Sequence, residues 1–476
     1  MFDEHYLELD EETLFQIERN DPVVTSLVLT ASSWIEGAGP SIGANTVLQE
    51  IFVKANNPGE HDWFHELCHG LSRNRCLESF KLWLCGCNPE LDIFHILTPF
   101  FMHNYNLRCI HVQYCSSQKF EYFVSALSKC KNTRVACLVI IQADITDEQG
   151  AVFFDLLHEM QHLSGLDFMH AGLGRSGCTA LAKLLKNPTS KIRTLQIDHH
   201  YSFDDDCISI LSEALVFNNT LDVVSLLGGG SDVTKAGWAN FCAVLSLPTC
   251  SLKQLILSRT DIGDEEVICL GDALASNDTV KSLDLSGSQL ITAGGWNGFS
   301  KCLRNPGSVL HELNLCECNI DEAGMLAIVS TLTDNSSLEA LVMVDASKFT
   351  DRVWKALECA LCDTSSIERT FSSNHTFHML SLKDFASYDD IAPEIILFLE
   401  MNEFEDKAEV ARQKILANHF IGEDIDIHAF QQMPESILPF AIEWIGSDED
   451  GFALLNTIVR GFPSLLDINS MIHVQG

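Results

Sequence analysis

Three hexapeptides decide the fold: LKQLIL (residues 252–257), VKSLDL (280–285) and LHELNL (310–315). Each places apolar residues at offsets −3, 0 and +2 around a central leucine, and the central leucines follow one another after 28 and 30 residues. Apolar residues at this spacing point to the inner side of a short strand. A period of this length predicts a stack of similar units, each burying its apolar side against its neighbours.

The same pattern extends along most of the chain. The central apolar residue recurs after 24 residues once and after 28 to 31 residues elsewhere, at Leu27, Ile51, Phe80, Ile110, Leu138, Leu166, Leu195, Val224, Leu255, Leu283, Leu313 and Leu341. Thr370 is a candidate start for a degraded thirteenth copy. Parallel neighbouring strands need a crossover of about a dozen or more residues. Segments 264–275 and 321–332 carry apolar residues three and four apart, which predicts helices there.

Two further features keep the same register. Five residues after each central position stands a small or short polar residue in eleven of the twelve copies; His200 is the exception. Asn218, Asn277 and Asn335 each follow a predicted helix and precede the next central position by six residues, which suits a helix end or a tight turn.

This pattern resembles the ribonuclease-inhibitor-like class of leucine-rich repeats, and the resemblance covers residues 23–384 as about 12–13 copies of 28–31 residues. The resemblance implies an α/β horseshoe solenoid with a parallel concave sheet and convex helices. It also implies a protein partner, commonly bound on the concave face. Fold alone does not identify that partner.

The two ends differ from the repeats. Residues 1–22 are predicted to form an acidic N-terminal cap, with a short helix over 11–18. Residues 385–476 hold 17 acidic and four basic side chains together with strongly apolar stretches, which predicts a small acidic helical domain rather than a solvated tail. Residues 403–420 read as an amphipathic helix within it. This domain is either a C-terminal cap or a separate partner-docking module.

Charge and composition exclude several functions. The formal charge of −36 disfavours nucleic acid and anionic membranes, whereas it would steer a basic protein partner. The N-terminus has no secretory pattern, and 18 scattered cysteines suit buried thiols in a reducing compartment. We therefore expect a cytoplasmic protein, without a cofactor, that binds another protein.

Three motifs suggest chemistry but fit the repeat better. Residues 65–69 match the zinc pattern H-E-x-x-H, and His61 extends it, yet the predicted helix places these histidines on its outer side. Residues 158–162 match the same pattern where a helix should end. Residues 172–177 match G-x-G-x-x-G, but a strand-to-helix passage of this repeat explains them, and Gly228 to Gly230 lack the lysine of a phosphate loop. We expect no catalytic or metal residues.

The side chains at offsets −1, +1 and +3 point out of the predicted concave sheet. Its first half holds larger apolar groups flanked by cations, and Phe52 and Trp83 lie one repeat apart, close enough to share a patch. Aromatic residues are common anchors of interfaces. The predicted partner-binding residues are Phe52, Lys54, Lys81, Trp83, His111, Val139, Ile141 and Met169.

The sequence thus favours a non-catalytic intracellular interaction scaffold. Two alternatives remain open at this stage. One is a GTPase activator resembling the Ran GTPase-activating family, which joins such repeats to an acidic C-terminal region. The other is a sensor segment resembling nucleotide-binding immune receptors, although the 476 residues contain no P-loop.

Overall fold

The computed structural model describes residues 6–55, 62–85, 92–130, 134–170, 172–198, 203–228, 232–343, 350–382 and 391–419. The chain divides into two compact units. Unit 1 comprises Met1–Ile291 with Glu317–Asn319, and unit 2 comprises Thr292–Cys316 with Ile320–Gly476. Both are built from alternating strands and helices, and the fourteen described strands are parallel and follow the order of the chain.

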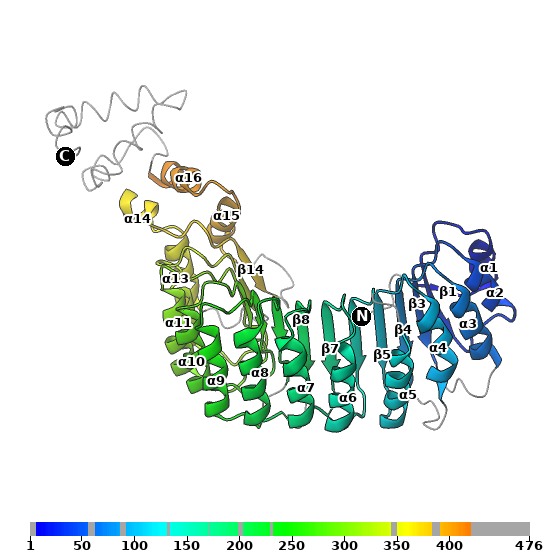
Figure 1. Cartoon of the computed structure of the whole chain (residues 1–476). Helices are drawn as coiled ribbons and strands as arrows, with labels where there is room; N and C mark the ends of the chain where they lie inside the picture. Colours follow the sequence, from blue (N-terminus) through cyan, green and yellow to red (C-terminus); the bar gives the residue numbers. More distant parts are fainter. Residues whose placement is uncertain are drawn as a thin grey trace, which may run out of the picture. The chain divides into compact units, whose positions relative to one another are not determined.

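Unit 1 holds the first eleven strands. They are β1 (Leu7–Glu8), β2 (Ser26–Thr30), β3 (Glu50–Lys54), β4 (Ser79–Trp83), β5 (Cys109–Gln113), β6 (Cys137–Ile141), β7 (Gly165–Met169), β8 (Thr194–Asp198), β9 (Val223–Ser225), β10 (Gln254–Ile256) and β11 (Ser282–Asp284). Its helices are α1 (Glu11–Glu18), α2 (Ala38–Ala44), α3 (Asp62–Arg73), α4 (Ile93–His103), α5 (Ser117–Ser128), α6 (Asp147–Leu157), α7 (Arg175–Lys186), α8 (Asp205–Phe217), α9 (Lys235–Leu245) and α10 (Asp264–Leu274). Figure 1 shows these helices along one side of the sheet, and in the described part of unit 1 no helix lies on the other side of the strands.

Unit 2 continues the same alternation. Its elements are α11 (Ala293–Leu303), β12 (Glu312–Asn314), α12 (Glu322–Val329), β13 (Ala340–Met343), α13 (Asp351–Leu361), α14 (Ile367–Phe371), β14 (Met379–Leu382), α15 (Pro393–Asn402) and α16 (Lys407–His419). The predicted amphipathic helix corresponds to α16. Residues 420–476, which make up most of the expected C-terminal domain, lie outside the described residues.

Strand pairing confirms the alignment read from the sequence. In unit 1 the predicted central residues stand directly opposite one another, from Leu27 beside Ile51 to Leu255 beside Leu283. These residues are almost completely buried. One more strand, β1, precedes them, because Leu7 pairs with Leu27. The repeat pattern in the sequence did not predict this strand.

The expected thirteenth copy was placed wrongly. Leu380, not Thr370, stands opposite Leu341 in unit 2. The segment before Leu380 contains both α13 and α14, and Thr370 lies in α14. A second helix, α14, lengthens this crossover. The usual spacing of the repeats therefore predicted a position ten residues before Leu380.

Buried asparagines tie several repeats to the repeat before them. Asn277 Nδ2 donates to the carbonyl of Leu245 at the end of α9 (2.7 Å). Its Oδ1 accepts from the N–H groups of Thr279 (2.9 Å) and Val280 (2.7 Å), which turn the chain toward β11. One amide thus satisfies backbone groups that would otherwise be buried without partners. The same arrangement occurs at Asn45, Asn74, Asn218, Asn335 and Asn374.

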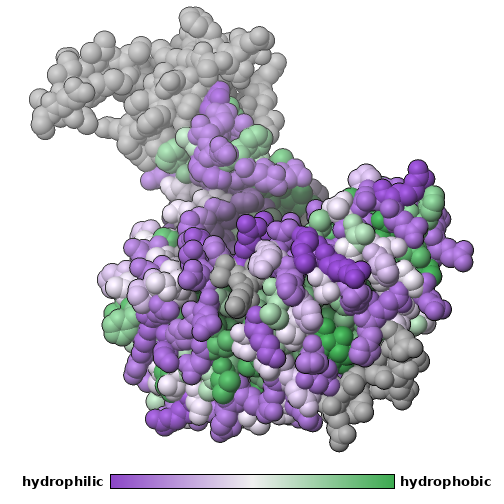
Figure 2. All heavy atoms as spheres, turned by 45° about the vertical axis from the view of Figure 1, so that its right-hand side comes forward, coloured by the Kyte–Doolittle hydropathy of each residue, from purple (hydrophilic) through white to green (hydrophobic). Residues whose placement is uncertain are grey.

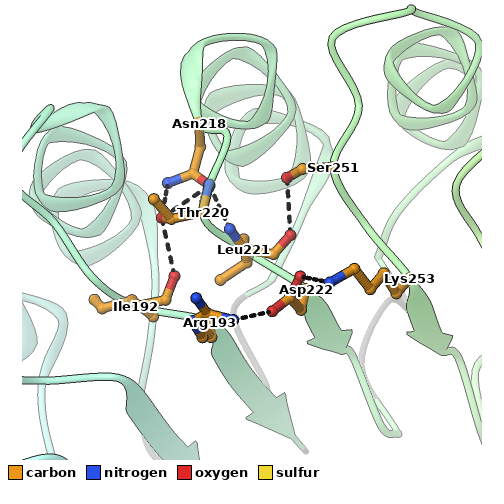
Figure 3. A network of polar contacts seen from close by, with 8 residues as sticks. All are labelled: Ile192, Arg193, Asn218, Thr220, Leu221, Asp222, Ser251 and Lys253. Carbon is orange, nitrogen blue, oxygen red and sulfur yellow. Dashed lines mark hydrogen bonds and ion pairs between the residues drawn. The ribbon is translucent and has the colours of Figure 1, made fainter.

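Figure 3 shows the turn at Asn218, where hydroxyl groups add to this connection. Asn218 Oδ1 accepts from the N–H of Leu221 (2.8 Å). Thr220 Oγ1 donates to the carbonyl of Ile192 in the preceding repeat (3.1 Å), and Ser251 Oγ of the following repeat donates to the carbonyl of Leu221 (2.9 Å). Three successive repeats are therefore held in register by side chains at their turns.

An ion-pair row lies at the start of the same strands. Asp222 contacts Arg193 (3.2 Å) on one side and Lys253 (2.8 Å) on the other. The cationic side chains are 69% and 61% exposed, so each pair contributes less than about 1 kcal/mol. The row supports the register without dominating the stability.

We predict that Asn277→Ala destabilises the solenoid by about 3 kcal/mol, because it leaves one carbonyl and two N–H groups buried without partners. Urea unfolding followed by circular dichroism measures the change. Asn240→Ala is the matched control, since the exposed Asn240 amide contacts only the Ser209 hydroxyl. Equal midpoints for the two variants would contradict this role for the buried asparagine.

Candidate functional site

The eight residues proposed from the sequence lie on five adjacent strands of unit 1, β3 to β7. Pairing places them in two rows on the side of the sheet away from the helices. One row contains Phe52, Lys81, His111 and Val139, and the other contains Lys54, Trp83, Ile141 and Met169. We call this surface the helix-free face.

Four aromatic rings form a continuous stack at the start of this face. The Phe52 and Trp83 rings are nearly parallel, with centroids 6.3 Å apart. Trp83 stacks in turn on Tyr114 (5.6 Å), and the edge of Tyr6 meets Phe52 (5.9 Å). We call Tyr6, Phe52, Trp83 and Tyr114 the aromatic stack. Such ring pairs contribute about 0.5–1.5 kcal/mol each beyond burial.

Two lysines lie against the aromatic stack. Lys54 Nζ is 5.1 Å from the Phe52 ring centroid and 5.7 Å from that of Trp83. Lys81 Nζ is 5.0 Å from the Tyr6 ring. The attraction between ammonium and ring faces fixes these side chains over the sheet. A strongly acidic protein therefore presents a small cationic and aromatic area here.

The sequence pattern did not predict two members of the aromatic stack. Tyr6 precedes β1, a strand that the repeat pattern did not reveal. Tyr114 follows β5 with a left-handed backbone (φ 58°), which turns its ring back toward Trp83. Phe52 is also less available than expected, because Tyr6 and Trp83 leave it only 9% exposed. Trp83 is half-buried, so its ring keeps part of its surface accessible.

The face changes character toward β7 and β8. Val139, Ile141 and Met169 give it a half-buried apolar middle. Beyond them, burial and the nearby Asp198 carboxylate raise the pKa of Asp167 to about 6. The helix-free face thus runs from cationic and aromatic, through apolar, to acidic.

His111 lies between these zones. Burial, and to a smaller extent the charge of Lys81, lower its pKa to about 4. The imidazole is therefore neutral at physiological pH. Among the described residues, neither His111 Nε2 nor Trp83 Nε1 has a hydrogen-bond partner, although both atoms are buried.

The glutamate of the first H-E-x-x-H motif, Glu66, makes structural hydrogen bonds to the neighbouring repeat. On α3, Glu66 Oε1 accepts from the N–H of Gly39 (3.2 Å) and Oε2 from the indole N–H of Trp34 (3.3 Å). The carboxylate expected of a general base is thereby held at the beginning of α2. His65 and His69 are exposed on the helix, as predicted, and His61 lies outside the described residues.

The second such motif is broken by the end of a helix. Helix α6 stops at Leu157, and His158 is its C-cap, so His162 does not share a helical face with it. This confirms the interpretation made from the repeat register.

The N–H groups of the G-x-G-x-x-G segment bind the carboxylate of a side chain of this protein, Asp147. Asp147 accepts from the N–H groups of Gly174 (2.9 Å), Ser176 (2.8 Å) and Gly177 (2.7 Å) at the beginning of α7. Burial alone would raise the pKa of Asp147, but these donors outweigh it and the pKa is lowered. The donors that would bind a phosphate in a nucleotide site thus bind a carboxylate of the preceding repeat.

The described residues contain no group of three or more His, Cys, Asp or Glu side chains placed to hold a metal ion. Among the helices that the structure describes, none combines the length and apolar character needed to cross a bilayer.

Comparison with known proteins agrees with this architecture. No protein-family model matches the chain. Human NACHT, LRR and PYD domains-containing protein 14 is 28% identical over 240 residues, 48% of this chain and 22% of that protein. The bovine protein 9 of the same description is 25% identical over 309 residues, 62% of this chain and 30% of that protein. Mouse ribonuclease inhibitor is 24% identical over 310 residues, 62% of this chain and 64% of the inhibitor.

Stacked parallel strands, helices on one side and these relatives together define the class. The chain has the fold of a leucine-rich-repeat solenoid, and its sequence is similar to that of ribonuclease inhibitor. It spans less than two thirds of the length of each relative above.

We predict that Asp147→Ala costs about 1–2 kcal/mol at pH 7, because three N–H groups at the start of α7 lose their acceptor. A lowered carboxyl pKa stabilises the fold above the unfolded value of about 4, and this contribution disappears as pH falls through the folded pKa. Urea midpoints of wild type and variant should therefore converge in acid. Asp155→Ala, which removes only an exposed ion pair with Lys183, should change little at either pH.

The placement of His111 predicts its titration. In NMR spectra the imidazole should remain neutral at pH 6 and titrate near pH 4. Lys81→Met should raise this midpoint only partly, since burial is the larger cause. His111→Gln assigns the resonance, and a midpoint near 6.5 in the wild type would show that the ring is not buried as described.

Proposed function

We propose that this protein is a non-catalytic scaffold that captures a protein partner on the helix-free face, with the aromatic stack and its two lysines as the anchor. The observation that carries this proposal is the cluster in which the Lys54 ammonium group lies against the stacked rings of Phe52 and Trp83. These side chains are ordered by one another before any partner arrives. A preorganised aromatic surface loses little conformational entropy on binding.

The chemistry of the face supports a partner rather than a substrate. Trp83, Ile141 and Met169 are half-buried apolar groups beside charged ones, which is the composition of interface cores and their rims. The proposed partner places apolar or aromatic groups on Trp83 and acidic groups near Lys54 and Lys81. The acidic end of the face, at Asp167, would accept a basic group, in keeping with the net charge of −36.

We propose that the chain is not an enzyme because the residues of its zinc-like and nucleotide-like motifs make structural contacts. Glu66 is occupied by Gly39 and Trp34, and Asp147 occupies the glycine-rich turn. Each group therefore stabilises contacts between repeats. No observation favours GTPase activation over a scaffold.

Similarity to ribonuclease inhibitor also supports protein binding, since that relative is named for its action on an enzyme. None of the seventeen cysteines in the described part of the chain is joined to another by a disulfide. We propose a reducing, cytoplasmic location on that basis, because so many reduced cysteines suit a reducing compartment.

Trp83→Ala should lower affinity for a partner isolated with the wild-type protein by at least tenfold, since central aromatic anchors contribute about 2 kcal/mol or more. The partner is obtained by affinity purification and mass spectrometry, and binding is then measured with purified proteins. Phe217→Ala is the control, because that ring is 72% exposed on α8, a helix on the other side of the sheet. Equal affinity of Trp83→Ala and wild type would refute the proposed anchor.

A further inference from the structure

A groove runs between α5 and α6, on the helical side of unit 1. Its volume is about 530 Å³, and its lining includes Phe120, Val124, Val152 and Leu156. Val152 is 60% exposed, which is unusual for a valine in the middle of a helix. Figure 1 shows the two helices standing side by side. On the face drawn in Figure 2, apolar areas form separate patches within a mainly hydrophilic surface.

The groove has a cause in the packing of the repeats. Glycines bring some neighbouring helices into close contact: a Cβ on Gly43 of α2 would lie 2.8 Å from the carbonyl oxygen of Gly70 of α3. Helix α5 contains no glycine. Instead, Phe120 of α5 packs against Phe153 of α6, with ring centroids 5.4 Å apart, and Phe123 also reaches Phe153 (6.5 Å). This layer of rings lies between the two helices, and Phe120 is the ring of the layer that lines the groove.

A polar bridge defines one end of the groove. Ser117 Oγ donates to Gln149 Oε1 (2.8 Å), and Gln149 Nε2 donates to Glu121 Oε1 (2.7 Å). These contacts connect the first turns of α5 and α6. Toward the other end of the helices the lining is Val124, Ser125 and Leu156, without such a bridge among the described contacts.

The charges around the groove are of one sign. Glu121 and Glu148 belong to its lining, which contains no lysine or arginine. An apolar floor between two helices with acidic edges fits an amphipathic helix that inserts its apolar side and directs basic residues outward. A second copy of this chain fits poorly, because each copy carries a charge of −36.

We propose that the α5–α6 groove is a second docking site, separate from the helix-free face, for an amphipathic helical segment of a partner protein that carries lysine or arginine beside its apolar residues. Val152 and Leu156 provide the apolar contact, and Glu121 and Glu148 select the basic flank.

The test uses the full chain and a fluorescent 18-residue peptide of leucine and lysine in amphipathic order, with binding followed by anisotropy at 0.15 M salt. Val152→Gln should weaken binding at least tenfold, and hydrogen exchange should show protection of α5 and α6 in the complex. The matched control is Val23→Gln, because Val23 is 70% exposed and lies outside the groove. The double variant Glu121→Gln, Glu148→Gln should weaken binding and reduce its dependence on salt.

Three outcomes would overturn the proposal. They are equal affinity of Val152→Gln and Val23→Gln, protection located elsewhere than α5 and α6, and binding of the apolar dye ANS in the groove without binding of the peptide. A peptide with glutamate in place of lysine should not bind. Trp83→Ala should bind the peptide like wild type, so failure here and failure of the helix-free face are distinguishable.

Discussion

The structure depends on one constraint: a repeat of about 29 residues cannot bury its own apolar side. Each strand turns its central leucine or equivalent residue inward, and only the neighbouring repeats and the overlying helices complete its surroundings. Stacking also brings backbone groups at each turn out of water. Buried asparagines such as Asn277 satisfy those groups across the repeat boundary, so apolar burial and hydrogen bonding require the same register.

This constraint explains why motifs associated with catalysis have structural roles here. The first turn of a helix has N–H groups without partners inside the helix, and here a helix of the preceding or following repeat lies close to them. A carboxylate at the right position on a neighbouring helix binds them, as Asp147 does for α7 and Glu66 does for α2. In two sequence patterns that elsewhere hold zinc or a phosphate, these contacts connect adjacent helices instead.

The repeat also leaves two kinds of surface on which function can vary. Side chains that point away from the helices are not needed for burial, which permits the stack of Phe52, Trp83 and Tyr114. On the other side, the spacing of neighbouring helices depends on the residues between them. Glycines bring α2 and α3 together, whereas phenylalanines separate α5 from α6.

The sequence by itself determined the strand register, the helices between the strands and which residues share the helix-free face, because a periodic pattern fixes side-chain direction along a strand. It did not reveal the rung at Leu7 or the position of Leu380, where crossover lengths depart from the period. Only the tertiary structure decided that Tyr6 and Tyr114 join Trp83 and Phe52, that Asp147 fills the turn at Gly174, and that α5 and α6 enclose a groove. These features depend on distances between repeats, which the packing of particular side chains sets and a one-dimensional pattern does not contain.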